Sequence, residues 1–121
     1  MNAPDDFAEC QSCRCAAARR QAHKLTRRYD AALRPHDLNI EQFTLLVNLI
    51  VGGPTPIALL AERLGLERTT LTRNLAVVSK RGWIDIMRGE DQRERVVVIL
   101  LAGQQKADDA RPAWKRAQAA A

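Results

Sequence analysis

Aromatic side chains are scarce in this chain of 121 residues, at 4 % of the total. A platform on which the bases of single-stranded nucleic acid could stack is therefore not expected. No apolar run reaches the roughly 20 residues that a helix needs to cross a bilayer. The acidic N-terminus does not have the basic and then apolar order of a signal peptide. These absences favour a cytoplasmic protein that has no membrane partner.

Cysteine is also rare, and its three residues, Cys10, Cys13 and Cys15, fall within six positions. An odd number of cysteines so close together is not the disulfide framework of a fold, and a reducing compartment keeps them as thiols. Common enzyme signatures are absent as well, among them His-Glu-x-x-His, Gly-x-Ser-x-Gly and Gly-x-x-x-x-Gly-Lys. We therefore expect no enzyme, no catalytic residue and no cofactor.

What the sequence does contain is the mixture of an ordinary globular protein, with 46 % hydrophobic and 27 % charged residues. Its length allows one domain with a modest core, which a partner subunit would help to stabilise. The lysines and arginines number 19 against 14 acidic residues, which gives a net charge of +5 and a pI near 9.6. A positive balance favours polyanionic partners.

The spacing of apolar residues divides the chain into a leader and a single domain. Residues 1–11 are predicted to be a flexible leader, and residues 12–121 to form the domain. The first helix of the domain covers residues 12–34 and ends at Pro35. This helix carries much of the excess positive charge.

Capping signals mark the helices that follow. Asn39 and Gln42 have the spacing of a capping box at the start of the second helix. Thr55 is expected to cap the next, short helix, with Pro56 at its first position. Gly65 then makes a tight turn into another helix, which Gly82 ends.

The order of elements predicts a fold class that is mainly α with a small β-hairpin, namely a winged helix-turn-helix. Residues 56–81 supply the helix-turn-helix. Two β-like runs within residues 83–100, separated by a polar tip, supply the hairpin or wing. Residues 102–121 are alanine-rich and read as a last helix, which Pro112 interrupts or restarts.

The second helix of the helix-turn-helix has an outer face suited to DNA. Leu71, Leu75 and Val78 form its inner face. The opposite face carries short hydroxyl and guanidinium side chains, which reach base edges and phosphates in the major groove of double-stranded DNA. These are Arg68, Thr69, Thr72 and Arg73, with Thr70 lying between the two faces. The alternative is an exposed helix with ordinary surface threonines.

The hairpin tip predicts a second contact with DNA. Arg93 is the residue we expect to enter the narrow, electronegative minor groove. Asp91 is expected to hold the Arg93 guanidinium by a bidentate pair rather than to contact DNA itself. The alternative is a charged turn that only faces solvent.

Taken together, these stretches resemble the MarR family of bacterial transcriptional regulators from about Cys15 to Trp114. The resemblance rests on Leu38 to Phe43 with Leu45-Leu46, on Leu60-Ala61-Glu62-Arg63-Leu64-Gly65-Leu66, on Arg68-Thr69-Thr70-Leu71-Thr72-Arg73-Asn74-Leu75, and on Asp91-Gln92-Arg93.

This resemblance implies a homodimer, built from the helices of residues 12–34 and 102–121, that binds a palindromic operator. It also implies repression that a small-molecule or peroxide effector relieves. Two departures stand out. Leu100 occupies the position where the family usually has a threonine that caps the last helix. The family also continues past the position of Ala121 into a long dimer-forming helix, so the dimer uses a shortened last helix or the chain is a truncated form.

Cys15 is a candidate redox sensor. A helix N-terminus and nearby arginines favour the thiolate form, which peroxides attack. Cys15 also resembles the reactive cysteine of the organic-hydroperoxide-sensing branch of the family, which precedes a tyrosine by the spacing that separates Cys15 from Tyr29. Cys10 or Cys13 would then be the resolving thiol. Against this, that branch uses more than one tyrosine and Tyr29 is the only one here. The alternative is that Cys15 is a small hydrophobe on the apolar stripe of the first helix, the face that would meet the dimer partner. This stripe consists of Cys15, Ala18, Ala22, Leu25, Tyr29 and Leu33.

Two other functions remain as alternatives. A thiol redox or metal-binding protein could use the winged-helix fold, although Cys13 and Cys15 would point nearly opposite ways in a continuous helix. His23 lies about 12 Å farther along that helix, too far to share an ion with them. A protein-interaction module would instead use the basic first helix.

Overall fold

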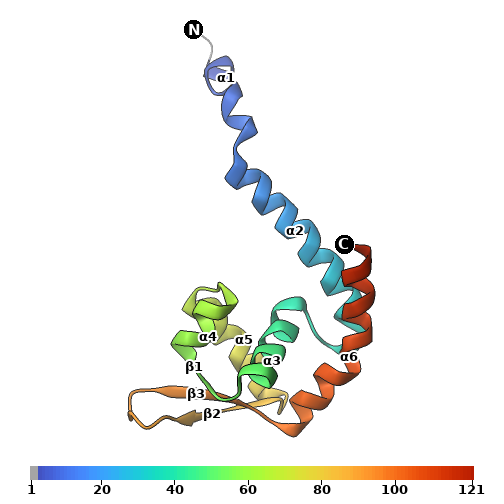
Figure 1. Cartoon of the computed structure of the whole chain (residues 1–121). Helices are drawn as coiled ribbons and strands as arrows, with labels where there is room; N and C mark the ends of the chain where they lie inside the picture. Colours follow the sequence, from blue (N-terminus) through green and yellow to red (C-terminus); the bar gives the residue numbers. More distant parts are fainter. Residues whose placement is uncertain (1–2) are drawn as a thin grey trace.

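The computed structural model describes residues 3–121, and the helices and the hairpin that the sequence predicts occur in the predicted order, together with short elements that it does not predict (Figure 1). The first part of the chain contains α1 (Ala3–Asp6), the 3-10 helix η1 (Ala8–Ser12), α2 (Arg14–Leu33) and the 3-10 helix η2 (Arg34–His36). The rest contains α3 (Ile40–Gly52), β1 (Thr55–Pro56), α4 (Ile57–Leu64), α5 (Arg68–Lys80), β2 (Ile84–Arg88), β3 (Arg95–Ile99) and α6 (Leu101–Ala120). The fold is mainly helical with a small antiparallel sheet, which confirms the predicted winged helix-turn-helix.

The predicted leader of residues 1–11 is mostly helical over residues 3–11 rather than loose, which differs from the prediction, and residues 1–2 lie outside the described part of the chain. Asp5 and Asp6 lie in the only turn of α1, where carboxylates interact favourably with the helix dipole. Together with η1 and the first half of α2, α1 extends away from the rest of the molecule (Figure 1). We call this segment, residues 3–24, the arm. Its side chains are exposed, except for the half-buried Ala16.

The second half of α2 packs along α6. The Tyr29 hydroxyl donates a hydrogen bond to Oε1 of Gln118, and Nη1 of Arg28 donates to the Ala120 carbonyl at 2.8 Å. The buried face of α6 consists of small residues, which let neighbouring helices approach closely. These residues are Gly103, Ala107, Ala110, Ala113 and Ala117.

The hydrophobic core joins α3 to the helix-turn-helix. The predicted capping box starts α3: Oδ1 of Asn39 accepts from the Gln42 N–H at 2.8 Å, and Oε1 of Gln42 accepts from the Asn39 N–H at 3.1 Å. From there α3 buries leucines against the inner faces of α4 and α5. The side chains that share this core include Leu45, Leu46, Leu49, Leu60, Leu71, Leu75 and Val78.

The sheet has three strands in the order β1-β3-β2, whereas the sequence predicts only the hairpin. Thr55 pairs with Val97, and its hydroxyl donates to the Gly53 carbonyl at 2.8 Å instead of capping α4. Pro56 is the N-cap of α4, so the helix begins one residue later than predicted. A proline has no N–H to donate to a sheet, so an edge strand is a suitable place for it.

The glycines that end α4 and α5 confirm the predicted turns. Gly65 and Gly82 adopt left-handed backbone conformations, with φ of 64° and 79°. Each helix closes with the paired hydrogen bonds of a Schellman motif, and in α5 the Trp83 N–H donates to Val78 while the Gly82 N–H donates to Ser79. These turns fix the angle at which α5 leaves α4 and at which the wing leaves α5.

Pro112 does not interrupt the last helix. α6 runs from Leu101 to Ala120 with Pro112 inside it. The proline is exposed, so the carbonyl of Asp108, which lacks its helical donor, can bind water instead. Leu100 is the N-cap and makes no side-chain capping bond, in keeping with the absence of a threonine there.

Candidate nucleic-acid interface

The outer face of α5 is the first part of the candidate interface. Its inner residues Leu71, Leu75 and Val78 are at most 2 % exposed, so they fix which face of α5 is turned outward. The four predicted contact residues Arg68, Thr69, Thr72 and Arg73 are exposed, and Thr70 is half-buried between the two faces. The Thr72 hydroxyl donates to the Arg68 carbonyl at 2.8 Å, which leaves its oxygen free to accept.

A polar contact that the sequence did not predict holds α5 against α3. Nδ2 of Asn74 donates to Oε2 of Glu41 at 2.8 Å. Asn74 lies next to Arg73, so this bond restrains the outer face of α5 at its middle. No local signal identifies such a pair, because the two residues are far apart in the sequence.

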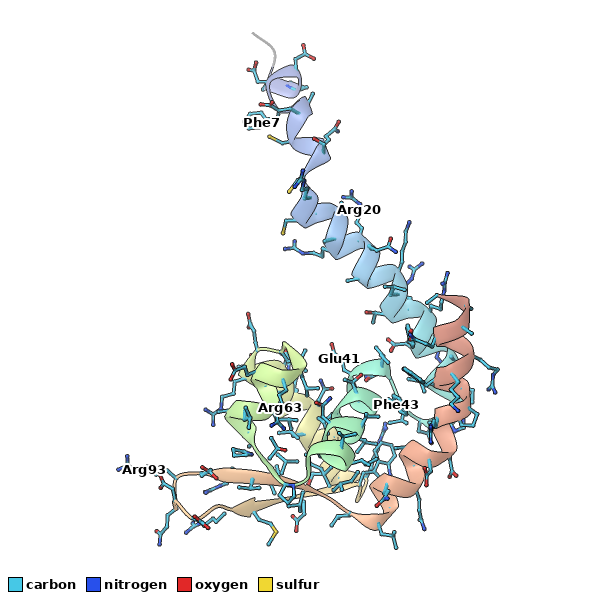
Figure 2. The ribbon with its side chains drawn as sticks, viewed as in Figure 1. Phe7, Arg20, Glu41, Phe43, Arg63 and Arg93 are labelled. Atoms are coloured by element: carbon cyan, nitrogen blue, oxygen red, sulfur yellow. The ribbon has the colours of Figure 1, made fainter. Side chains whose placement is uncertain are left out.

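The wing tip is organised by Asp91, but not through the contact that the sequence predicts. Oδ1 of Asp91 accepts a hydrogen bond from the backbone N–H of Arg93 at 3.0 Å. The Asp91 carbonyl also accepts from the Glu94 N–H at 2.8 Å. Asp91 therefore shapes the turn, as an aspartate that bonds the backbone two residues on commonly does. It holds the Arg93 main chain and not its guanidinium. Figure 2 shows Arg93 at the far end of the wing.

The fold brings Arg68 of α5 to the same surface as the predicted residues of the wing. Arg68, Asp91 and Arg93 line the same hollow of about 270 Å³, together with Arg95. The first residues of α4, Ile57 and Ala58, form the wall of the hollow at the N-terminus of that helix. Guanidinium groups and a helix N-terminus both attract phosphate. The surface can therefore hold a nucleic-acid backbone while the outer face of α5 reaches the bases.

The cysteines lie far from this surface, at the exposed end of the molecule. Cys10, Cys13 and Cys15 are exposed, and Nη2 of Arg19 contacts Sγ of Cys15 at 4.0 Å. The Cys13 N–H donates to the Cys10 carbonyl at 3.2 Å, so these two residues share one turn. Tyr29 is about 21 Å from Cys15 along the helix axis, at 1.5 Å per residue. Within one chain the structure does not bring Tyr29 and Cys15 together.

A groove between α3 and α6 is a further feature that the sequence did not predict. It has a volume of about 480 Å³ and is lined by Phe43, Val47 and Trp114, with Arg111 and Asp108 also in its wall. The rings of Phe43 and Trp114 stack with their centroids 6.2 Å apart. The groove forms because two helices from distant parts of the sequence meet, which leaves no local signature.

Within residues 3–121, no helix combines the length and hydropathy needed to cross a membrane. The same residues contain no group of three or more histidine, cysteine, aspartate or glutamate side chains placed to hold a metal ion.

Two packed helices with a glycine turn, followed by a hairpin with an arginine at its tip, define the class of winged helix-turn-helix proteins. The model of the MarR family matches residues 36–94, which include α3, both helices of the helix-turn-helix and most of the wing. The crystal structure of the transcriptional regulator MosR of M. tuberculosis, solved in complex with DNA, is 38 % identical with a TM-score of 0.82. That match covers 89 % of this chain and 79 % of MosR. The chain therefore belongs to the MarR family of transcriptional regulators.

Two other relatives are more distant. A mutant of the E. coli protein MarR, crystallised with operator DNA, has a TM-score of 0.74 at 18 % identity and shows the shared fold; the match covers 91 % of this chain and 76 % of that one. The uncharacterized HTH-type transcriptional regulator YwoH of Bacillus subtilis is 27 % identical over 88 residues. That alignment covers 73 % of this chain and spans 64 % of the length of YwoH.

Proposed function

We propose that this chain is a transcriptional repressor that binds a palindromic operator in double-stranded DNA as a homodimer and is released by a small-molecule or oxidant effector. The observation that carries the proposal is the single surface formed by α5 and the wing. In this proposal Arg68 and Arg73, both exposed on α5, would contact the major groove, with Thr69, Thr70 and Thr72 beside them. Arg93, which lines the same hollow as Arg68, would enter the minor groove. The crystal structure of the relative MosR in complex with DNA supports a DNA-binding role for this chain.

The first helix of residues 12–34 and the last helix of residues 102–121, which correspond to α2 and α6, would supply the dimer contacts. The arm has no packing partner among residues 3–121 beyond its own helix, and an isolated helix of this length is marginal in water. A second copy would bury the apolar stripe that continues from Leu25 toward Cys15. The two copies of α5, the recognition helix, are then related by a two-fold axis. They read half-sites roughly 34–36 Å apart, which is one helical turn of DNA.

Selection from random duplexes tests the function directly. We expect purified protein to enrich a palindromic sequence, and light scattering to show two protein chains in each complex. The affinity should fall steeply with salt, because each neutralised phosphate releases counterions. If micromolar protein shows no salt-sensitive binding to any duplex, a thiol redox or metal-binding protein with a winged-helix fold becomes the better explanation.

An effector has two places to act. The apolar groove between α3 and α6 can take a small organic molecule, with Arg111 available for an anionic group. The cysteines offer the alternative, release by an organic hydroperoxide. In that reaction the Cys15 thiolate attacks the peroxide, forms a sulfenic acid and releases an alcohol. The thiol of Cys10 or Cys13 then displaces water from the sulfenic acid to form a disulfide.

If oxidation of Cys15 releases the protein from DNA, an organic hydroperoxide should weaken operator binding at least tenfold. Cys15→Ser should abolish this response. Mass spectrometry of the oxidised protein should show the loss of two hydrogens, as a disulfide requires. The double variant Cys10→Ser, Cys13→Ser is the matched control, and it should stop at the sulfenic acid. Binding that persists after full oxidation would exclude oxidant release, and the groove would remain as the effector site.

A further inference from the structure

Trp83 is the residue at which the recognition helix, the wing and α6 meet. It directly follows the Schellman turn that ends α5, and its N–H donates to the Val78 carbonyl at 3.1 Å. Its side chain is 7 % exposed. Ile84, the next residue, begins β2. A movement of Trp83 would therefore move both the end of α5 and the base of the wing.

The backbone of Trp83 also holds the start of α6. The Trp83 carbonyl accepts a hydrogen bond from the N–H of Leu100, the N-cap of α6, at 3.0 Å. Gly103, in the first turn of α6, lies so close that a Cβ atom there would be 2.2 Å from the same carbonyl oxygen. The first turn of α6 thus rests directly on the Trp83 main chain, with no room for a side chain between them.

The Trp83 ring lies within reach of two cations from different elements. The Arg81 guanidinium lies 5.0 Å from the ring centroid, and Nζ of Lys106 lies 5.6 Å from it. Both distances are within the range of a cation–π interaction. Nη1 of Arg81 also donates to the carbonyl of Asp37, which lies between η2 and α3. We call Arg81, Trp83, Gly103 and Lys106 the Trp83 joint.

The next residues of α6 connect this joint to the rest of the molecule. Ala107, which follows Lys106, lines the groove between α3 and α6, as do Arg111 and Trp114. Farther along, α6 packs on α2 through Gln118 and Ala120. One continuous helix therefore passes from the proposed dimer contacts, along the proposed effector groove, to the base of the recognition helix.

We propose that the Trp83 joint sets the angle between α6 and the unit formed by α5 and the wing, and that Lys106 is a positioning residue for DNA binding that does not contact DNA. The inference rests on the proposed function. In a dimer joined through α2 and α6, this angle sets the distance between the two recognition helices. The joint would thereby determine which spacing of operator half-sites the dimer accepts.

Loosening the joint should lower affinity by reducing the fraction of molecules that are ready to bind. The apparent dissociation constant rises as that fraction falls. A cation–π contact is modest in strength, so removing the Lys106 ammonium should weaken operator binding by roughly threefold to tenfold. The salt dependence should stay the same, because no phosphate contact is lost.

The test compares Lys106→Ala with Lys115→Ala, which removes the same charge from an exposed position on the same helix. Because α6 is also a proposed dimer element, light scattering first checks that both variants remain dimers. We expect weaker binding and a broader range of accepted half-site spacings for Lys106→Ala only, with recovery in Lys106→Arg. Unchanged affinity in Lys106→Ala would overturn the proposal. A smaller salt slope would also overturn it, since it would mean that Lys106 contacts a phosphate.

A measurement without DNA separates this inference from the proposed function. In Trp114→Phe, Trp83 is the only tryptophan, so its fluorescence reports on the joint alone. Adding Lys106→Ala should change the emission of Trp83, whereas adding Lys115→Ala should not. If the emission changes but no duplex is bound, the proposed function is wrong and the contact between Lys106 and Trp83 is still supported. If the emission is unchanged, the proposal about the Trp83 joint is wrong, whatever the DNA result.

Discussion

Replacing Arg73 by alanine is expected to remove most of the operator's advantage over other DNA. Arg73 is exposed on the outer face of α5, where a guanidinium can bind a guanine through two hydrogen bonds. Each such contact contributes about 1–3 kcal/mol of discrimination, and a dimer loses two of them. The affinity for the selected operator should therefore fall by roughly 30-fold to 10⁴-fold. Titration of the operator and of single-base variants, at one salt concentration, measures both the loss and the relaxed specificity.

Arg20→Ala is the matched control, because Arg20 is an exposed arginine far from α5 (Figure 2). It is five residues from both Cys15 and Leu25, so it lies on the face of α2 opposite the apolar stripe proposed for the dimer contact. The variant removes the same charge and should leave operator affinity nearly unchanged. The opposite pattern, in which Arg20→Ala impairs function and Arg73→Ala does not, would favour a protein-interaction module that uses the basic first helix.

The wing should respond differently from α5. Arg93→Ala is expected to weaken binding to all sequences alike, because the minor groove distinguishes base pairs poorly. The salt slope should fall by about one for each arginine that stops neutralising a phosphate. An Arg93 variant with the same affinity over the whole salt titration would show that the tip stays away from DNA.

The elements that the sequence predicts correctly depend on local signals. The capping box of Asn39 and Gln42 and the turns at Gly65 and Gly82 each need only residues a few positions apart. Thr55 shows the limit of this reasoning. A threonine before a proline is a good helix cap, yet Thr55 pairs with Val97, a strand residue far along the chain. Long-range pairing overrode the local preference.

The candidate site shows the same difference between contacts that depend on local signals and contacts that depend on long-range packing. The outward face of α5 follows from helical spacing, because the buried leucines determine which side faces solvent. The predicted contact between Asp91 and the Arg93 guanidinium is wrong, because a carboxylate two residues before an arginine can reach either its guanidinium or its backbone N–H. The structure has the backbone contact. The bond from Asn74 to Glu41 and the approach of Lys106 to Trp83 join distant segments, which spacing in one sequence does not reveal.

Charge was also an incomplete guide to the interface. Much of the net positive charge lies on the first helix, in Arg14, Arg19, Arg20, Lys24, Arg27 and Arg28. The polar tip of the wing contains three arginines and three acidic residues and has no net charge: Arg88, Arg93 and Arg95 against Glu90, Asp91 and Glu94. The candidate interface is therefore identified by where Arg68, Arg73 and Arg93 lie rather than by bulk charge.

Gly103→Ala should destabilise the fold, although helix propensity predicts the reverse. Alanine at an exposed helical position is more favourable than glycine by about 1 kcal/mol. At Gly103, however, the new Cβ would lie 2.2 Å from the Trp83 carbonyl oxygen, which is a backbone atom and cannot turn aside. Either α6 shifts, and the hydrogen bond from Leu100 to Trp83 breaks, or the wing moves. Overpacking of this kind typically costs about 1–3 kcal/mol net.

Thermal unfolding distinguishes the two expectations, because overpacking lowers the Tm whereas the higher helix propensity of alanine raises it. The close approach predicts a Tm lower by roughly 3–15 °C, at a few degrees for each kcal/mol in a domain of this size. Gln104→Ala is the control, because Gln104 is exposed and one position farther along α6, and this variant should melt at or slightly above the temperature of the unaltered chain. Operator binding should weaken in Gly103→Ala even at temperatures where the variant is folded, because α6 no longer rests on Trp83. If Gly103→Ala instead melts at a higher temperature than the unaltered chain, α6 does not press against Trp83. The recognition helix would then be oriented by other contacts.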